Sequence, residues 1–226
     1  MSHLYIQTIT TSALQTPQFY QTLGYDIVEV ENTKWAASIS SIIKIGEHQQ
    51  DRLGLVLFDA QASSLLSDKG YKVFNNTIND FVISPSGVKI YIHSTPAPSF
   101  ENNNPLVAGN CMGISLETPS MEDSVAFWEA LGFSIAMGEI SQGWVAMSHS
   151  SGSMISLMKT GICPHQFFNP SLTFFNGKEG NPVVIDKIRK LDIEIAEEIT
   201  HFNKENIVDN IIIKDPAGIG FFIFND

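Results

Sequence analysis

The sequence has few cysteines, no long apolar segment and little basic charge. Among its 226 residues only Cys111 and Cys163 are cysteines, too few for a disulfide framework in a chain of this length. No apolar run approaches the roughly 18 residues that a transmembrane helix needs. The first residues contain neither a basic segment nor a long apolar one, so we predict no secretory signal. We therefore expect a reduced, cytoplasmic protein.

Basic residues are outnumbered almost two to one. The chain has 13 Lys and Arg against 24 Asp and Glu, a formal net charge of −11 and a pI near 4.9. Nucleic-acid binding needs a basic surface, and anionic membranes repel an acidic one, so we expect neither partner. Residues 1–100 carry a net charge of −2, from 6 basic and 8 acidic residues. Residues 101–226 carry −9, from 7 basic and 16 acidic residues, which predicts solvated acidic faces or a field that attracts cationic ligands.

Two similar stretches lie 108 residues apart. The first reads PQFYQTLGYDI from Pro17 and the second reads VAFWEALGFSI from Val125. Both contain an aromatic pair, then Leu-Gly-aromatic, then an apolar segment, and Trp35 and Trp144 follow at nearly the same offset. The chain therefore contains an internal repeat, which decides how the rest of the sequence is interpreted.

Each half also closes on one pattern. SPSGVKIYI begins at Ser84, and DPAGIGFFI begins at Asp215. Between the halves lies TPAPSFENNNP, beginning at Thr95, whose prolines and asparagine run are typical of a linker. We predict an N-terminal domain at 1–95, a linker at 96–110 and a C-terminal domain at 111–226.

Hydrophobic periodicity predicts the same order of elements in both halves. Strands are expected at 4–10 and 112–118, each followed by a helix; Ser120 is the expected N-cap of the second helix, and Gly132 its end. Three strands follow in each half, at 27–30, 35–39 and 42–45, and at 135–137, 144–147 and 154–158. The pattern then repeats with a strand at 53–58, a helix at 62–68 and strands at 71–74, 80–83 and 88–93. Its second-half equivalents are a strand at 172–175, a helix at 182–191 and strands at 193–196, 208–213 and 219–224. The predicted fold class is α+β, with four βαβββ modules.

These motifs, in this order and repeated twice, resemble the vicinal oxygen chelate superfamily, which includes glyoxalase I, bleomycin-resistance proteins and extradiol dioxygenases. The resemblance covers essentially the whole chain apart from the linker. It implies two glyoxalase-like domains, each a cupped mixed sheet made of two modules with a ligand cavity inside. It also implies a divalent metal, held by a His or Gln from the first strand of a module and a Glu from its last strand.

The expected metal positions do not carry metal ligands. The first-strand position falls at Tyr5 and Gly113, with Gln7 and Ser115 on the same face. The last-strand position, usually Glu, falls at Tyr91 in the first half and at Phe222 in the second. We therefore predict no metal and no other cofactor. The fragment Cys163-Pro164-His165 is weak support for a metal site, because two ligands in a proline-containing loop are not a donor set.

Nine residues are candidate ligand contacts on the inner faces of the cups. They are Tyr5, Gln7, Tyr91 and His93 in the first domain, and Gly113, Ser115, Trp144, Thr173 and Phe222 in the second. For each the alternative is ordinary packing, because the inner face of a cup is also a core. Phe222 opposite the small Gly113 and Ser115 would either stack on a planar ligand or fill the space that they leave. We expect the larger cavity in the second domain because its modules are longer.

The leading functional hypothesis is a metal-independent small-molecule-binding protein that resembles the glyoxalase and bleomycin-resistance branch. Its ligand would be cationic or aromatic. Three alternatives stay open: a metal-dependent lyase or dioxygenase with displaced ligands, a metal-free isomerase-like enzyme, and a structural or regulatory module whose cups are filled by side chains. Whether the chain is an enzyme is therefore undecided. We expect a monomer, because two domains already pair within one chain.

Overall fold

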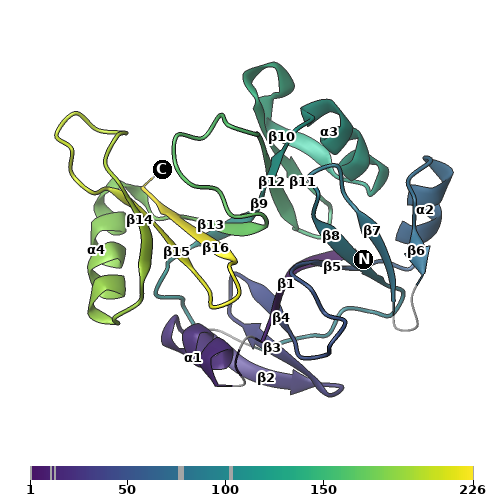
Figure 1. Cartoon of the computed structure of the whole chain (residues 1–226), viewed down its shortest axis with the longest axis horizontal. Helices are drawn as coiled ribbons and strands as arrows, with labels where there is room; N and C mark the ends of the chain where they lie inside the picture. Colours follow the sequence, from purple (N-terminus) through teal and green to yellow (C-terminus); the bar gives the residue numbers. More distant parts are fainter. Residues whose placement is uncertain (1, 11, 13, 76–78, 102–103, 226) are drawn as a thin grey trace.

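The computed structural model describes residues 2–10, 12, 14–75, 79–101 and 104–225. Two eight-stranded mixed sheets and four helices make up the fold (Figure 1). The first sheet contains β1 (His3–Ile9), β2 (Asp26–Val30), β3 (Thr33–Ala37), β4 (Ile42–Gly46), β5 (Gly54–Phe58), β6 (Phe74–Asn75), β7 (Asp80–Ile83) and β8 (Lys89–His93), with helices α1 (Gln15–Thr22) and α2 (Ala62–Asp68).

The second sheet is built from residues after the linker. Its strands are β9 (Cys111–Thr118), β10 (Ser134–Glu139), β11 (Trp144–Ser148), β12 (Met154–Lys159), β13 (Ser171–Phe175), β14 (Ile195–Ile199), β15 (Asn210–Lys214) and β16 (Gly220–Phe224). Its helices are α3 (Met121–Ala130) and α4 (Gly177–Lys190), with a short 3₁₀ turn at Ile140–Gln142.

Strand order is the same in the two sheets, β2-β3-β4-β1-β5-β8-β7-β6 and β10-β11-β12-β9-β13-β16-β15-β14. In each, the first strand of the half is central: β1 is parallel to β4 and antiparallel to β5, and β9 is parallel to β12 and antiparallel to β13. Each sheet therefore joins two βαβββ modules. The α+β class and the four modules predicted from the repeat are confirmed.

Alternation along the central strands separates two faces. On β1, Leu4 and Ile6 enter the large core that both halves share, whereas Tyr5 packs with a smaller cluster around Trp35 and Phe58. Successive side chains of a strand point to opposite sides of its sheet. We call the side that carries Tyr5 the cup face of the first sheet. Phe222 marks the cup face of the second sheet, where it packs apart from the shared core.

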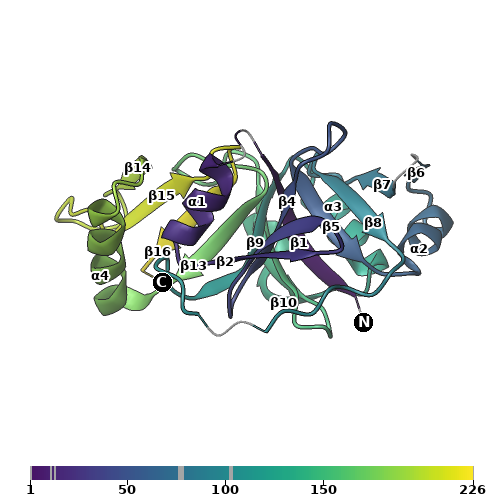
Figure 2. The same ribbon diagram turned by 90° about the horizontal axis from the view of Figure 1, so that it is seen from below.

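The face of each sheet opposite its cup face packs against helices and against the other half of the chain. Phe19 and Tyr20 of α1 contact Phe221 of β16, with ring centroids 5.6 and 6.2 Å apart, so the first helix of one half packs on the last strand of the other (Figures 1 and 2). At the other end, Tyr71 contacts Phe127 of α3, 5.0 Å between centroids. The apolar core thus runs continuously from one half to the other.

Residues of the predicted linker take part in this packing. Leu106 and Ala108 are buried in the shared core, and Phe100 lies against Trp35 with ring centroids 5.4 Å apart. Asn102 and Asn103 lie outside the described residues. The boundaries at 95 and 110 stay predictions, although the strands of the two sheets do divide between His93 and Cys111.

Several predicted elements have the wrong bounds. The strands predicted at 35–39 and 193–196 are Thr33–Ala37 and Ile195–Ile199, and α4 and β6 differ as well. α4 begins at Gly177, and Pro182 lies inside it, because the buried Asn181 anchors the early turns through hydrogen bonds to the carbonyls of Asp209 and Ile223. The strand predicted at 71–74 is reduced to Phe74–Asn75, since Tyr71 turns to pack on α3. Within the described residues, no helix has the length and apolar character to span a membrane.

Candidate functional site

A buried lysine lies at the centre of the first cup face. Lys44 of β4 is 8% exposed, and its Nζ donates a hydrogen bond of 2.8 Å to Oε1 of Gln7 on the adjacent β1. Gln7 is itself completely buried. Burial lowers the pKa of Lys44, and the charge of Asp51 acts in the opposite direction. A cationic group therefore occupies the middle of the sheet, where its charged form is poorly solvated.

Hydrogen bonds connect Lys44, through Gln7, to the loop of residues 47–53 that joins β4 to β5. Gln7 Nε2 donates to the backbone carbonyl of Arg52 at 2.9 Å. The backbone N–H of Arg52 in turn donates to the hydroxyl of Tyr91, also at 2.9 Å. Tyr91 is 4% exposed, and burial raises its pKa. The structure thus brings the candidates Gln7 and Tyr91 together, with Lys44 and Arg52 as additional members of the cluster.

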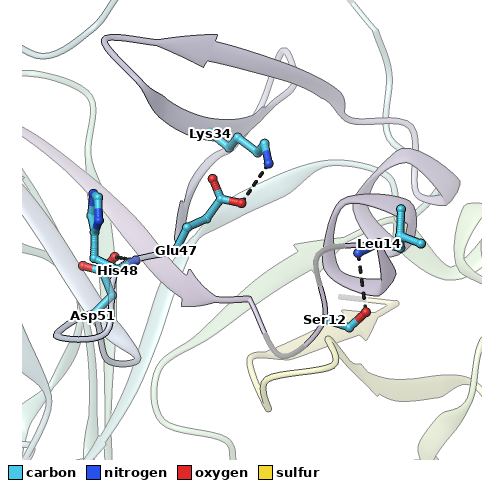
Figure 3. Close-up of polar contacts among 6 residues, drawn as sticks. All are labelled: Ser12, Leu14, Lys34, Glu47, His48 and Asp51. Atoms are coloured by element: carbon cyan, nitrogen blue, oxygen red, sulfur yellow. Dashed lines mark hydrogen bonds and ion pairs between the residues drawn. The ribbon is translucent and has the colours of Figure 1, made fainter.

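The covering loop, residues 47–53, joins β4 to β5. Glu47 forms an ion pair of 2.8 Å with Lys34 of β3, and the backbone N–H of His48 donates to Asp51 Oδ2 at 2.9 Å (Figure 3). Gly46 and Gly54 flank the loop. A Cβ at Gly46 would meet the side chain of Asp51 at 2.7 Å, and one at Gly54 would lie 2.2 Å from a backbone carbonyl. Gly46 therefore lets Asp51 of the loop lie against β4, and Gly54 lets β5 approach the Lys89 carbonyl of β8.

Aromatic rings form the neighbouring part of the cup. Tyr5 contacts Trp35 and Phe58, with ring centroids 5.8 and 5.9 Å apart. His93 stacks on Phe58 at 4.9 Å. The four first-domain candidates, Tyr5, Gln7, Tyr91 and His93, therefore share one face, with an aromatic side and a polar side.

His93 is the least satisfied member of this group. Its Nε2 is buried and has no hydrogen-bond partner among the described residues. Burial, together with the positive charge of Lys44, lowers its pKa to about 4. The imidazole is therefore neutral near pH 7, and a proton on it would be costly next to the lysine.

Charge in the first cup is opposite in sign to that of the whole chain. Lys89 of β8 joins Lys44 and Arg52 there, with its Nζ 4.5 Å from the centroid of the Tyr91 ring. Asp51 is the carboxylate whose charge acts on Lys44, Lys89 and His93. Three cations and one carboxylate make this region locally basic in a protein with a net charge of −11.

The second cup has a different floor. Ser115 and Thr173 hydrogen-bond through their hydroxyls at 2.6 Å, and Thr173 pairs with Gly113 on one side and Phe222 on the other. These four candidates therefore adjoin one another. Trp144 lies on β11, half-buried, with β12 between it and β9. It is not in the same immediate group.

Part of the second cup is filled by the loop between β12 and β13. Phe167 lies over Phe222 with ring centroids 4.9 Å apart, and His165 lies 5.4 Å from the same ring. Phe168 takes the space above Gly220: a Cβ added at Gly220 would lie 2.8 Å from the Cβ of Phe168. Phe222 is consequently 2% exposed. The sequence predicts that Phe222 either stacks on a planar ligand or fills space within the cup. Its contacts with Phe167 and His165 are those of a side chain that fills space.

A cavity does exist in the second half, but Phe222 does not line it. It has a volume of about 550 Å³ and is lined by Phe224, Asn210 and residues of the segment 202–209, together with Lys178 and Asn225. A second cavity, of about 500 Å³, lies between the halves.

Comparisons with known proteins identify the architecture. No family model matches the sequence, and no curated protein does. Among solved structures, a homoprotocatechuate 2,3-dioxygenase variant from B. fuscum superimposes with a TM-score of 0.59 at 14% identity, over 98% of this chain and 70% of that one. The 2,3-dioxygenase LapB from Pseudomonas sp. KL28 gives 0.58 at 17% identity, over 96% and 89%.

A Mn(II)-bound glyoxalase from Novosphingobium aromaticivorans also matches, with a TM-score of 0.58 at 13% identity over 98% of this chain and 82% of that one. The chain has the vicinal oxygen chelate fold. Identities this low establish the fold, while the activity has to come from the chain's own residues.

The vicinal oxygen chelate fold implies a divalent metal in a cup, so the available donors decide whether one fits. In the part of the chain that the structure describes, no group of three or more His, Cys, Asp or Glu side chains is placed to hold an ion. The first cup has a lysine ammonium at its centre, and the second has hydroxyls beside a phenyl ring. Neither donor set suits a divalent metal.

Sequence reasoning missed the residue around which the first cup is organised. Lys44 interrupts the apolar segment Ile42-Ile43-Lys44-Ile45, and a lone lysine on the inward parity of a central strand was the available signal. Asp51 and the covering loop could not be found in this way, because loop closure depends on contacts with distant strands.

Proposed function

We propose that this vicinal oxygen chelate protein binds a small organic anion in its first cup without a metal ion. The observation that carries the proposal is the buried ammonium of Lys44. Its direct partner is the neutral amide of Gln7, and the ion pairs of the described residues, formed by Lys34 and Arg189, do not include it. The charge of Asp51 reaches this cation without forming an ion pair with it. A buried cation without a directly paired anion is unfavourable, and an anionic ligand would supply that partner.

The surroundings of Lys44 narrow the ligand class. Lys89 and Arg52 add positive charge, whereas Tyr5, Trp35 and Phe58 offer apolar and aromatic surface next to it. An aromatic carboxylate combines the two requirements, since its ring packs on aromatic side chains while its charge pairs with the lysine. This proposal changes the sign of the ligand charge expected from the acidic composition, because the local charge of the cup differs from the net charge of the chain.

Ligand entry requires the loop at 47–53 to move. In this structure the loop is held to the sheet by two hydrogen bonds, from Gln7 to the Arg52 carbonyl and from the Arg52 N–H to Tyr91, and by the partly exposed ion pair of Glu47 with Lys34. Together the two hydrogen bonds contribute roughly 1–3 kcal/mol, a cost that a bound anion can offset by its ion pair. Residues 47–50 are exposed, so moving them disturbs little apolar surface, whereas Leu53 at the end of the loop packs against the shared core.

The experiment compares two probes of similar shape and opposite charge. Benzoate should bind and raise the melting temperature of the protein, whereas benzylamine should do neither. Lys44→Met should weaken benzoate binding at least tenfold, while Lys69→Met, at an exposed position after α2, should leave it unchanged. Calorimetry at several pH values adds a further check: affinity should fall as pH rises through the lowered pKa of Lys44, below the usual lysine range.

The proposal would be overturned if Lys44→Met bound benzoate as tightly as the parent chain. Tighter binding of benzylamine than of benzoate would instead support the cationic ligand expected from the sequence. The filled-scaffold alternative is favoured by the deep burial of Gln7, Lys44 and Tyr91. Under it, neither probe alters the melting temperature and Lys44→Met is as stable as the parent chain or more stable.

A further inference from the structure

A cleft of about 500 Å³ lies between the two halves; it touches each cup at one residue, Tyr5 and Gly113, and does not include Lys44 or Phe222. Its lining comes from four equivalent segments: the starts of β1 and β9 (residues 3–6 and 111–114), and the turns that precede β4 and β12 (residues 38–42 and 151–154), with Leu172 in addition. The internal repeat therefore supplies matching walls. Since each half contributes one strand start and one turn, the cleft is complete only when both halves are folded together.

The lining carries no Lys, Arg, Asp or Glu among the described residues, although the chain has 37 such residues in all, 13 basic and 24 acidic. Its ionisable groups are His3, Tyr5 and Cys111. Burial raises the pKa of Tyr5, and it raises that of Cys111 to about 12, so both are neutral near pH 7. A charged ligand would lose its hydration here without gaining a counter-ion.

Polar and apolar groups are both present in the cleft. Five serines line it, at positions 38, 40, 41, 151 and 153, and they come from the two turns. The Ser40 hydroxyl is buried without a hydrogen-bond partner among the described residues. Ile42, Met112, Met154 and Leu172 supply apolar surface from the strands. The volume lies within the range of small-molecule sites, which are often found at domain interfaces.

We propose that this cleft is a second small-molecule site, which takes an uncharged ligand with hydroxyl groups on an apolar body. The serine turns would bind the hydroxyls, and the methionine and branched side chains would contact the apolar part. This inference does not depend on Lys44 or on the covering loop, although Tyr5 adjoins both the cleft and the first cup.

The test uses three linear probes of equal chain length that differ in charge: 1,6-hexanediol, adipate and 1,6-diaminohexane. The reporter is the methyl signal of each methionine in protein labelled with [methyl-¹³C]methionine. Met112 and Met154 line the cleft, whereas Met137 of β10 is 62% exposed elsewhere and serves as an internal control. Hexanediol should shift the Met112 and Met154 signals saturably and leave Met137 unchanged, and the charged probes should shift neither.

A pair of serine variants tests the hydroxyl contact. Ser40→Ala should weaken hexanediol binding about three- to tenfold, the effect of losing one hydrogen bond. Ser67→Ala, at an exposed position of α2, should have no effect. Ser153→Trp should abolish the shifts by filling the cleft. The proposal is overturned if hexanediol moves Met137 as much as the cleft methionines, if it shows no saturation, or if adipate or the diamine binds more tightly.

Discussion

His93 and Lys44 show how burial in the first cup controls ionisation. The imidazole has a pKa lowered to about 4 by burial and by the charge of the lysine, against about 6.5 for an unperturbed histidine. A histidine with a lowered pKa in the folded state stabilises the fold above its unfolded pKa, and this contribution is lost as the pH falls toward the folded value.

His93→Phe should therefore change the acid sensitivity of the protein. Between pH 6.5 and 4 we expect the parent chain to lose about 1–2 kcal/mol of stability through His93, after allowing for its partial exposure. His93→Phe should lack this loss and keep the stacking on Phe58. Urea unfolding at pH 7 and at pH 4.5 measures both quantities, with His201→Phe, at an exposed loop position, as control. The explanation fails if the two variants lose stability equally over this range.

The β15–β16 turn shows how one element joins the two halves. Asp215 is 2% exposed and accepts hydrogen bonds from the hydroxyls of Thr8 and Tyr20, in the first half. It also accepts the N–H groups of Ala217 and Ile219 within its own turn. Burial raises the pKa of this carboxyl, while the hydrogen bonds act to lower it.

Asp215→Ala should cost about 2–4 kcal/mol of unfolding free energy, since it leaves several buried donors without an acceptor. The equivalent turn of the first half provides a matched control. Ser84 there accepts one weak hydrogen bond, of 3.3 Å, from Val88, so Ser84→Ala should cost about 1 kcal/mol or less. Chemical denaturation of both variants compares them directly. Equal costs would mean that Asp215 does not join the halves.

The β12–β13 loop makes a second prediction at this scale, because it fills the second cup around Phe222. Phe222→Ala should cost about 3–5 kcal/mol through the cavity that it opens beneath Phe167. Phe175→Ala on the neighbouring strand, where the ring is 37% exposed, should cost clearly less. If instead Phe222→Ala is nearly neutral for stability, the ring is not a packing element and a ligand-stacking role becomes the better explanation.

For the whole molecule, metal content separates the metal-dependent chemistry expected from the resemblance from the proposed function. Purified protein should contain far less than one divalent ion per chain, and EDTA should leave its melting temperature unchanged. Elemental analysis with and without EDTA measures this. A stoichiometric metal whose removal lowers stability would show that a donor set exists that the described residues do not reveal, and would favour the metal-dependent enzyme.

Assembly is the other property of the whole molecule. The two halves share one core and are joined covalently, so each has its partner at high effective concentration. Sedimentation at micromolar concentration should report a monomer of 24.9 kDa. A tight dimer would indicate that an apolar surface of the paired sheets remains to be covered, with the exposed Ile135 and Met137 of β10 as the first residues to replace.

The sequence by itself determined the repeat, the order of the elements and the face on which each central residue lies. These features depend on short-range periodicity, because alternation along β1 is enough to place Tyr5 and Gln7 on the opposite side from Leu4 and Ile6. The Ser120 cap is equally local, and it accepts the N–H of Asp123 at 3.3 Å, as its spacing predicts.

Only the tertiary structure decided what occupies the cups. Lys44 acquires its significance because the loop at 47–53 covers it, and Phe222 is buried because Phe167 reaches it from a loop 55 residues earlier in the chain. The early start of α4 depends in the same way on distant carbonyls that accept from Asn181. Such contacts join segments far apart in sequence, and their energies depend on geometry that no local pattern of residues encodes.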